Sequence, residues 1–189
     1  MINIIGGKFK KKKIEVPIKK VRPTSSIIRE AIFSILESYA LKQSINIYKE
    51  KCFIDLFAGS GAIGLEAISR GSAYAYFYEI NKEVCEILNR NCKKICKDNE
   101  FKIYNQDSYF IKDLVVNLPV SAIFLDPPYE IKSFDVILEN ILSNNILDKN
   151  SFIIIETNNI KLEIYNNKFI VIKEKIYGKT KIIFLKKLF

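Results

Sequence analysis

The 189-residue sequence predicts an α/β fold in which a mostly parallel β-sheet is covered by helices on both faces. Three observations predict it. Beyond residue 50, short apolar segments alternate with helical patterns. Those segments are almost continuously hydrophobic, as buried parallel strands are. The last two segments are joined by the short turn YGKT, which indicates an antiparallel hairpin at one edge.

The first 40 residues form a different kind of segment. Two β-prone pieces, INII and KIEVPI, flank the turn GGKFKKKK, while lysines and prolines leave residues 1–23 without an obvious core. From Ser25 to Tyr39, apolar residues recur at helical spacing and predict an amphipathic helix. We therefore expect an N-terminal basic hairpin and helix extension over 1–40, and a second unit over 41–189.

The second unit is expected to begin with a connector at about 40–50, followed by the alternation itself. Strands are predicted over 52–58, 73–79, 101–104, 121–126 and 151–157. Helices are predicted over 61–70, 81–97 and 133–143, with a short helix near 108–115. The segments KFIVIKEKIY and TKIIFLKK form the final hairpin.

Composition excludes several classes of protein. The chain has no histidine, which rules out Ser-His-Asp triads, Cys-His dyads and His-ligated zinc. Cys85, Cys92 and Cys96 share one helical stripe and are interpreted as core residues, so no metal site is expected. With four cysteines, no apolar run long enough to span a membrane and no secretory signal pattern, we expect a cytoplasmic protein.

Positive charge is concentrated at the two ends of the chain. The net charge of +9 divides into about +7 over residues 1–30, −4 over 31–160 and +6 over 161–189. Compositional bias toward lysine would have affected the centre as well. The distribution therefore favours a central binding or catalytic body flanked by surfaces that face a polyanion such as nucleic acid.

A glycine-rich loop, residues 58–64, follows the first predicted strand of the alternation. It reads Ala-Gly-Ser-Gly-Ala-Ile-Gly and contains the spacing G-x-G-x-x-G, with Glu79 ending the next strand 20 residues after Gly59. This is the context of a nucleotide-binding turn, in which the acidic residue hydrogen-bonds ribose hydroxyls. A phosphate-binding P-loop is excluded because no Lys-Ser/Thr pair follows Gly64.

The acidic residues around this loop favour a cationic ligand. Asp55 precedes Gly59 by four residues, where a carboxylate would repel a pyrophosphate but would suit an ammonium or sulfonium group. S-adenosylmethionine has ribose, adenine and a cationic methionine end without phosphate, so it fits better than NAD. Asp107, in the run Asn105-Gln106-Asp107-Ser108, is placed to bind the adenine amino group.

The tetrad Asp126-Pro127-Pro128-Tyr129 follows the apolar strand AIFL. Two prolines fix the backbone and remove two N–H donors, so that Asp126 and the Pro127 carbonyl can accept the hydrogens of an exocyclic amine. Tyr129 can stack on the base. Methyl transfer from an activated donor needs mainly alignment and electrostatics, which a chain without histidine can supply.

These motifs resemble the RsmD-like family of class I S-adenosylmethionine-dependent methyltransferases, which methylate the N2 amine of a guanine, guanine 966, in 16S small-subunit ribosomal RNA. The resemblance rests on IIGGKFKKKKIEVP, RPTSSIIREAIFSIL, DLFAGSGAIGLEAISRG, YEIN and FLDPPY. It implies a Rossmann-like seven-strand sheet, a monomer, and an N-terminal extension that engages RNA. The opening departs from the family pattern, because lysines stand where Gly and Arg are usual.

The expected site residues follow from the motifs and the resemblance together. The catalytic residues are Asp126, Pro127, Pro128 and Tyr129. The residues expected to hold S-adenosylmethionine are Asp55, Phe57, Gly59, Gly61, Gly64, Glu79, Asn81, Gln106, Asp107 and Asp126. The residues expected to contact RNA, within a ribosomal particle or assembly intermediate, are Lys8, Lys10, Lys11, Lys12, Lys13, Arg22, Thr24 and Arg29.

Three other functions compete with this one. An adenine-N6 methyltransferase acting on RNA or DNA shares the tetrad, and only the family resemblance selects guanine. A NAD-dependent oxidoreductase would need an acid-base group, and both the absent histidine and Asp55 count against it. A catalytically silent RNA-binding protein could keep the same fold, although the intact tetrad argues against that role.

Overall fold

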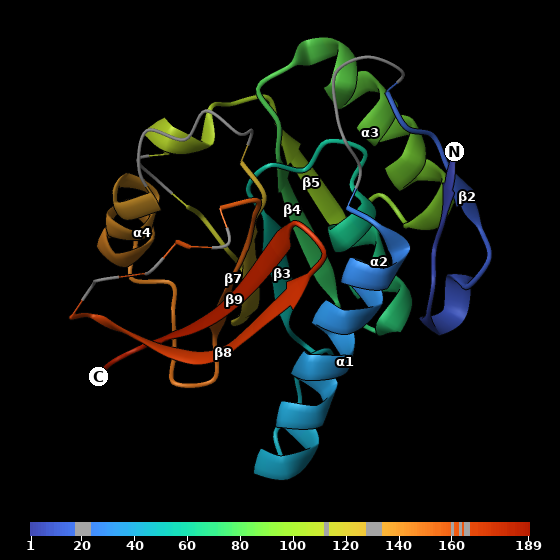
Figure 1. Cartoon of the computed structure of the whole chain (residues 1–189). Coiled ribbons are helices and arrows are strands. Elements are labelled where there is room, and N and C mark those ends of the chain that lie inside the picture. Colours follow the sequence, from blue (N-terminus) through green and yellow to red (C-terminus); the bar gives the residue numbers. More distant parts are fainter. Residues whose placement is uncertain (18–23, 112–113, 128–133, 160, 163, 165–166) are drawn as a thin grey trace.

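The computed structural model describes residues 1–17, 24–111, 114–127, 134–159, 161–162, 164 and 167–189. Its centre is a seven-stranded sheet in the order β5-β4-β3-β6-β7-β9-β8 (Figure 1). The strands are β3 (Cys52–Asp55), β4 (Tyr74–Tyr78), β5 (Phe101–Tyr104), β6 (Val120–Leu125), β7 (Phe152–Thr157), β8 (Phe169–Tyr177) and β9 (Thr180–Lys187). β3 to β7 pair in parallel, whereas β9 pairs antiparallel with both β7 and β8. The predicted α/β sheet with its C-terminal hairpin is confirmed.

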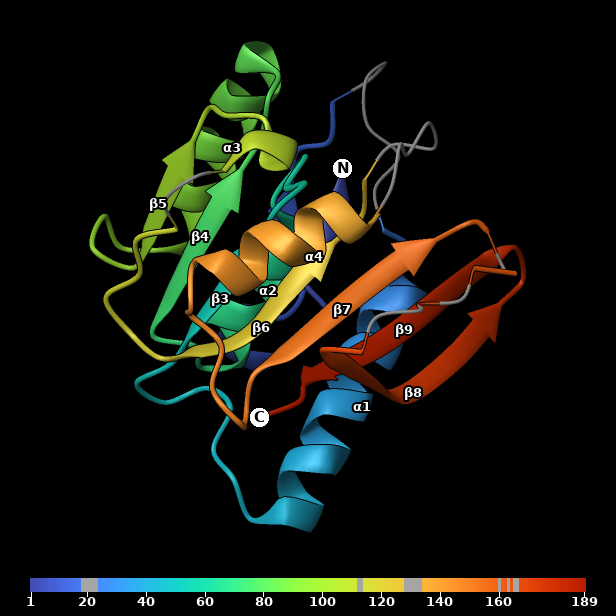
Figure 2. The ribbon, with the colours of Figure 1, turned by 90° about the vertical axis from the view of Figure 1, so that its left-hand side faces the viewer.

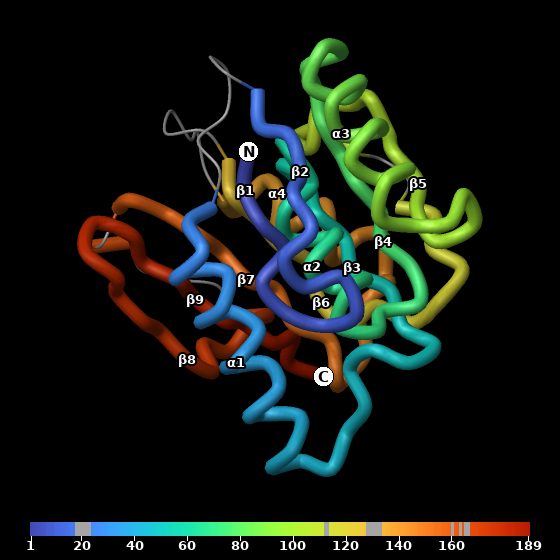
Figure 3. Tube along the Cα trace, turned by 90° about the vertical axis from the view of Figure 1, so that its right-hand side faces the viewer, coloured from blue at the N-terminus to red at the C-terminus, as the bar shows by residue number. Residues whose placement is uncertain are grey.

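The helices cover both faces of the sheet, as expected. α1 (Ser26–Gln43), α2 (Ala62–Arg70) and α3 (Lys82–Ile95) lie on one face, which Figure 3 presents to the viewer. α4 (Phe134–Ser143) lies on the other face, seen in Figure 2. Near 108–115 the described residues form a single 3-10 turn, η2 (Ser108–Phe110), instead of the longer helix expected there. Among the described residues, no helix is both long and apolar enough to cross a membrane.

Alternating strand residues send their side chains into different buried clusters, because successive side chains point to opposite faces of a sheet. Ile54 and Ile123 pack under α4 with Leu138. On the other face, Phe53 and Phe184 belong to a second cluster, which also contains five residues of α1: Ile28, Ile32, Phe33, Leu36 and Ala40. The boundary expected after residue 40 therefore falls inside α1, a helix that packs on the sheet.

The N-terminal segment forms a small hairpin, as predicted. β1 (Ile2–Asn3) pairs antiparallel with β2 (Lys13–Ile14), and a 3-10 turn, η1 (Gly7–Phe9), lies between them. Ile4 and Ile14 are fully buried in a third cluster, with Leu65 of α2 and Leu88 of α3. The hairpin thus packs on the helical layer instead of extending from it (Figure 3).

Candidate functional site

The strand order predicts a crevice at the carboxyl ends of the strands, because the direction in which strands are added reverses between β3 and β6, which makes this a topological switch point. From β3 the chain proceeds to β4 and β5 on one side, and then returns to β6 and β7 on the other side. Ligands of open α/β sheets bind outside the carboxyl ends of the strands at this switch point. We call the carboxyl ends of β3 to β7 the carboxyl-end edge. Asp55, Glu79, Asp107, Asp126 and Glu156 all lie there.

The glycine loop begins this edge, between β3 and α2. Gly59 and Gly61 both have left-handed backbone conformations, with φ of 51° and 80°, which glycine adopts without strain. The loop is held to the neighbouring strand, because the Ala58 N–H donates to the Tyr78 carbonyl at 2.9 Å. The Gly59 N–H donates to Oε2 of Glu79 at 3.0 Å. Glu79 therefore already fixes the loop that it was predicted to serve.

Packing also requires glycine at two positions of the loop, Gly61 and Gly64. A β-carbon at Gly61 would collide with the side chain of Leu88, and one at Gly64 would collide with the ring of Phe77. Both neighbours are completely buried, so neither can move away cheaply. The glycines let α2 approach β4 and α3 closely enough for the helix to begin directly at the crevice.

Glu79 and Asn81 organise the start of α3. The second carboxylate oxygen of Glu79, Oε1, accepts the Asn81 N–H at 2.8 Å. The side-chain oxygen of Asn81 in turn accepts the N–H groups of Glu83 and Val84, which caps the helix. In the structure, the Asn81 side chain caps α3. Its assignment to the cofactor site stays a prediction.

Asp55 is the most unusual titratable group of the edge. The residue is 2% exposed, and its Oδ1 has no hydrogen-bond partner among the described residues. Burial raises the pKa of Asp55 to about 7, and nearby Glu79 and Glu156 add to the rise, although backbone hydrogen bonds from Phe57 and Gly64 oppose it. A buried carboxyl with an open oxygen among other carboxylates fits a cationic ligand.

The loop after β5 closes one end of the crevice. The Ser108 hydroxyl donates to the Leu56 carbonyl just beyond β3. Oδ1 of Asp107 accepts the Tyr109 N–H at 2.9 Å and so caps η2, while Gln106 is exposed. Phe57 packs edge-on against Tyr109, with ring centroids 5.8 Å apart. Asp107 and Phe57 therefore come to the same end of the crevice, joined by contacts that the sequence analysis did not anticipate.

The predicted catalytic tetrad begins directly after β6. Asp126 is half-buried and Pro127 is buried. Pro128 and Tyr129 lie outside the described residues. Because Asp55 pairs in register with Phe124, the end of β6 is adjacent to the end of β3. The tetrad thus starts beside the glycine loop, at the switch point.

Five carboxylates gather at the carboxyl-end edge: Asp55, Glu79, Asp107, Asp126 and Glu156. Glu156 is the one of these five that was not among the predicted site residues. It is 8% exposed in β7 and raises the pKa of Asp55. An edge so rich in negative charge is unsuited to a pyrophosphate, which weighs against a NAD site.

The predicted RNA-contacting lysines lie away from this edge. The Phe9 N–H donates to the Ser69 hydroxyl at 2.9 Å, and Lys8 lies 3.9 Å from Glu100. Ser69 is at the end of α2 opposite the glycine loop. α2 has nine residues, so it separates the two ends by about 13 Å. Lys8, Lys10, Lys11 and Lys12 are exposed at this far end, and Lys13 is exposed on β2.

Arg29 does not fit its expected role as an RNA contact. Its side chain is buried, with the residue 1% exposed. Nη1 donates to the Asn3 carbonyl at 3.0 Å and lies 3.6 Å from Oε2 of Glu66. Burial lowers the pKa of Arg29, while Glu66 opposes that change. Helical spacing was an available signal for this burial, because Arg29 stands three and seven positions before Ile32 and Leu36, on the buried face of α1. Thr24 is also buried, and Arg22 lies outside the described residues.

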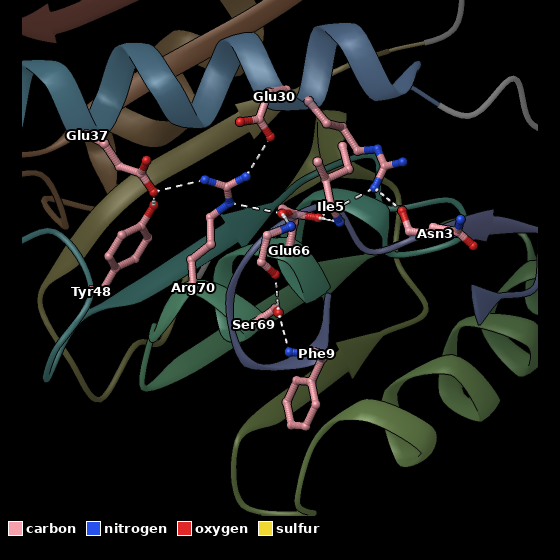
Figure 4. Close-up of polar contacts among 11 residues, drawn as sticks. Asn3, Ile5, Phe9, Glu30, Glu37, Tyr48, Glu66, Ser69 and Arg70 are labelled. Carbon is pink, nitrogen blue, oxygen red and sulfur yellow. Dashed lines mark hydrogen bonds and ion pairs between the residues drawn. The ribbon is translucent and has the colours of Figure 1, made fainter. Parts of the chain in front are cut away.

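The sequence analysis missed the partner of Arg29, Glu66. This carboxylate is fully buried in α2 and accepts the N–H groups of Ile5 and Gly6 at 2.8 and 2.7 Å. It also accepts Nε of Arg70 at 2.9 Å (Figure 4). Arg70 continues the network to Glu30 and Glu37 of α1. A signal was available, because Glu66 is the single charged residue of the segment AIGLEAIS.

The network fixes the N-terminal hairpin against two helices. Buried carboxylates are tolerated when paired and hydrogen-bonded, and Glu66 has four donors or cations around it. Gly6 and Gly7 allow the close approach, because a β-carbon at Gly6 would meet the Arg70 guanidinium and one at Gly7 would meet the Ser69 carbonyl. The hairpin is therefore joined to α2, the helix that begins at the glycine loop.

Comparison with known proteins finds one family and several relatives that match nearly the whole chain. The family described as "Conserved hypothetical protein 95" matches residues 2–186. The protein named Ribosomal RNA small subunit methyltransferase D from Buchnera aphidicola subsp. Acyrthosiphon pisum is 36% identical over 93% of this chain and 87% of its own. The protein of the same name from Haemophilus influenzae is 31% identical over 94% and 89%. The solved structure of a candidate methyltransferase, yhhF, from Escherichia coli is 26% identical, covers 98% of this chain and 97% of its own, and has a TM-score of 0.81.

Proposed function

Because the chain belongs to the "Conserved hypothetical protein 95" family, the RsmD-like family of S-adenosylmethionine-dependent ribosomal RNA methyltransferases, we propose that it methylates a guanine of 16S ribosomal RNA. The proposed acceptor is the exocyclic N2 amine of guanine 966, as the resemblance implies. The proposed donor is S-adenosylmethionine.

The observation that carries this proposal is the buried Asp55 carboxyl with its open oxygen, beside the glycine loop. A carboxyl removed from water needs a partner to remain ionised. The cationic methionine end of S-adenosylmethionine is such a partner, whereas a pyrophosphate is not. The carboxylates of this edge therefore fit the proposed cofactor.

Each end of the cofactor is assigned to a different part of the edge. Asp55 would hold the cationic methionine end, and Glu79 would accept hydrogen bonds from the ribose. Asp107 would accept a hydrogen bond from the adenine amino group, and Phe57 would provide apolar contact to the adenine. When bound, S-adenosylmethionine supplies a methyl group that is already activated for transfer to a nucleophile. The loop glycines admit the ligand to the start of α2.

We assign the tetrad to binding and orienting the acceptor amine of the target base. Asp126 and the Pro127 carbonyl would accept its two hydrogens, which directs the nitrogen lone pair toward the methyl donor. Tyr129 would stack on the base and hold its plane. Asp126 would accept the amine proton that is released when the nitrogen–carbon bond forms and the sulfur–carbon bond of the donor breaks, with S-adenosylhomocysteine as the leaving group. Alignment and hydrogen bonding then provide the catalysis.

The acidic edge cannot itself bind RNA phosphates, so that role belongs to other surfaces. We assign it to the exposed lysines of the N-terminal hairpin, about 13 Å from the loop along α2. These lysines would contact RNA that flanks the target base. The base must be extruded or already unpaired to reach the tetrad.

Identification of the labelled nucleoside tests the proposal. Purified protein is incubated with radiolabelled S-adenosylmethionine and small-subunit ribosomal particles from cells that lack this protein. We expect label in N2-methylguanosine, and its loss in Asp126→Ala. Label in N6-methyladenosine would overturn the substrate but keep the reaction class. Binding of cofactor and RNA without any label would indicate an RNA-binding protein that is not an enzyme.

A further inference from the structure

One buried side chain joins the N-terminal hairpin to the glycine loop. Asn91 of α3 is 1% exposed. Its Oδ1 accepts the Glu15 N–H at 2.8 Å. Its Nδ2 donates to the Glu15 carbonyl at 2.9 Å and to the Ser60 carbonyl at 3.0 Å. Both hydrogens and the oxygen of the amide are therefore engaged, and all three partners are backbone groups.

The two partners of Asn91 belong to regions with different proposed roles. Ser60 lies in the glycine loop between Gly59 and Gly61, the two positions with left-handed φ. Glu15 follows β2, at the end of the hairpin that leads toward α1. Hydrogen bonds to backbone groups on both sides fix the position of one main chain relative to the other, whatever the identity of the residues there.

A second connection lies along the same hairpin. Glu66 holds the N–H groups of Ile5 and Gly6 to α2, the helix that starts from the glycine loop (Figure 4). The first strand of the hairpin is thus tied to the body of α2, and the second strand is tied to the loop. The hairpin and the loop cannot shift independently without breaking buried hydrogen bonds, which is costly.

We propose that Asn91 is a positioning residue that couples RNA binding by the N-terminal hairpin to cofactor binding by the glycine loop. The inference rests on the proposed function, since it takes the hairpin lysines as RNA contacts and the loop as the cofactor site. A ligand that orders the loop also orders the hairpin through Asn91. Because coupling between two sites is reciprocal, RNA strengthens cofactor binding by the same factor.

A thermodynamic cycle measures the coupling. We would measure the affinity of the full chain for small-subunit particles that lack the modification. The measurement is made with and without saturating S-adenosylhomocysteine, the product that the cofactor becomes after methyl transfer. We expect the product to tighten RNA binding by about fivefold or more, the lower range of typical couplings. In Asn91→Leu, which keeps the branched shape and the number of heavy atoms but removes the three hydrogen bonds, the factor falls toward one, and any remainder passes through Glu66. S-adenosylhomocysteine binding without RNA changes by less than about threefold, because the loop glycines and acidic residues remain.

Two further variants keep the test decisive. Asn91→Asp has the same size and retains the acceptor for the Glu15 N–H, but presents a carboxylate to the Ser60 carbonyl. We expect Asn91→Asp to reduce the coupling factor as well, and it provides the test if Asn91→Leu fails to fold. Asn144→Leu is the matched control, since Asn144 accepts the Leu114 N–H and donates to the Asn140 carbonyl at the far end of α4. It should leave the coupling intact.

The outcomes separate this inference from the proposed function. A coupling factor of one in the unaltered protein, with RNA and product both bound and N2-methylguanosine formed, overturns the coupling alone. Equal loss of coupling in the Asn91 and Asn144 variants also overturns it, because it indicates general destabilisation. Failure of the unaltered protein to bind RNA or S-adenosylhomocysteine at all overturns both.

Discussion

The glycine loop and the N-terminal hairpin meet through Asn91, but different kinds of contacts hold them. The loop is fixed by its own glycine conformations and by Glu79, the acidic end of the next strand. The hairpin is fixed by side chains more than 60 positions away in the sequence, Glu66 and Asn91. The first region is specified by a local motif, whereas the second is specified by the tertiary fold.

This difference separates the effects of substitutions in the two regions. Changes at the carboxyl-end edge should alter cofactor binding and catalysis while the hairpin stays in place. Changes at Glu66 or Gly7 should displace the hairpin while the edge keeps its chemistry. Each prediction below tests one side of this division.

The largest effect on catalysis is expected at Asp126. Asp126→Ala removes the side chain assigned to the acceptor amine and should lower kcat by about 100- to 1000-fold, as the loss of one positioned hydrogen-bonding group does in other enzymes. RNA affinity should remain close to that of the unaltered protein. Asp98→Ala, at an exposed turn residue, is the control. A similar loss of RNA affinity and kcat in Asp126→Ala would contradict the assignment.

The largest effect on stability is expected at Glu66. Glu66→Gln leaves Arg29 buried without its counter-charge, and removing one partner of a buried pair costs about 3–5 kcal/mol of unfolding free energy. Denaturant titration measures this change. The exposed pair Lys168–Glu139 provides the comparison, because Glu139→Gln should cost less than about 1 kcal/mol. Equal effects at the two sites would show that the hairpin junction is not a major source of stability.

A matched pair of glycine substitutions tests the comparison directly. Gly61 and Gly7 both have positive φ, of 80° and 72°, and both lack room for a β-carbon. Either change to alanine should cost about 1–3 kcal/mol of stability. Gly61→Ala should weaken cofactor binding, whereas Gly7→Ala should weaken RNA binding and spare the cofactor. Calorimetry with S-adenosylhomocysteine and RNA-binding assays distinguish them, and identical binding profiles would refute the division.

The sequence was sufficient to predict the loop and its acidic partners, whereas on the other side it predicted the hairpin but not the contacts that hold it in place. Gly59, Glu79 and Asp55 stand at fixed positions relative to predicted strands, so their convergence follows from parallel-sheet geometry. Glu66 binds the N–H groups of Ile5 and Gly6, and backbone groups leave no trace in the sequence. Arg29 was assigned to the RNA contacts through the family resemblance, which does not reveal that its side chain is buried against Glu66. The helix end near 115 was also missed.

pH should affect the edge through Asp55. Burial raises its pKa to about 7, so the carboxyl is largely neutral at pH 6 and ionised at pH 8. A cationic ligand prefers the ionised form, and cofactor affinity should therefore rise by up to about tenfold over this interval. In the free protein, stability should fall as pH rises from about 4 to 7, since the folded state binds the extra proton. Asp55→Asn should flatten both profiles, and an unchanged pH dependence of binding in that variant would exclude Asp55 as its source.

The smallest effect is expected at the tip of the hairpin. Lys10 and Lys12 are exposed about 13 Å from the glycine loop, so they can contact flanking phosphates but not the target base. Replacing both with Gln should reduce the slope of log affinity against log salt by up to about two, and weaken RNA binding at low salt. kcat at saturating RNA and cofactor affinity should not change, because the edge and its carboxylates remain. The same change at the exposed Lys42 and Lys49 controls for net charge. A loss of kcat in the hairpin variant alone would mean that these lysines reach the reacting base, and that the hairpin and the edge form one site.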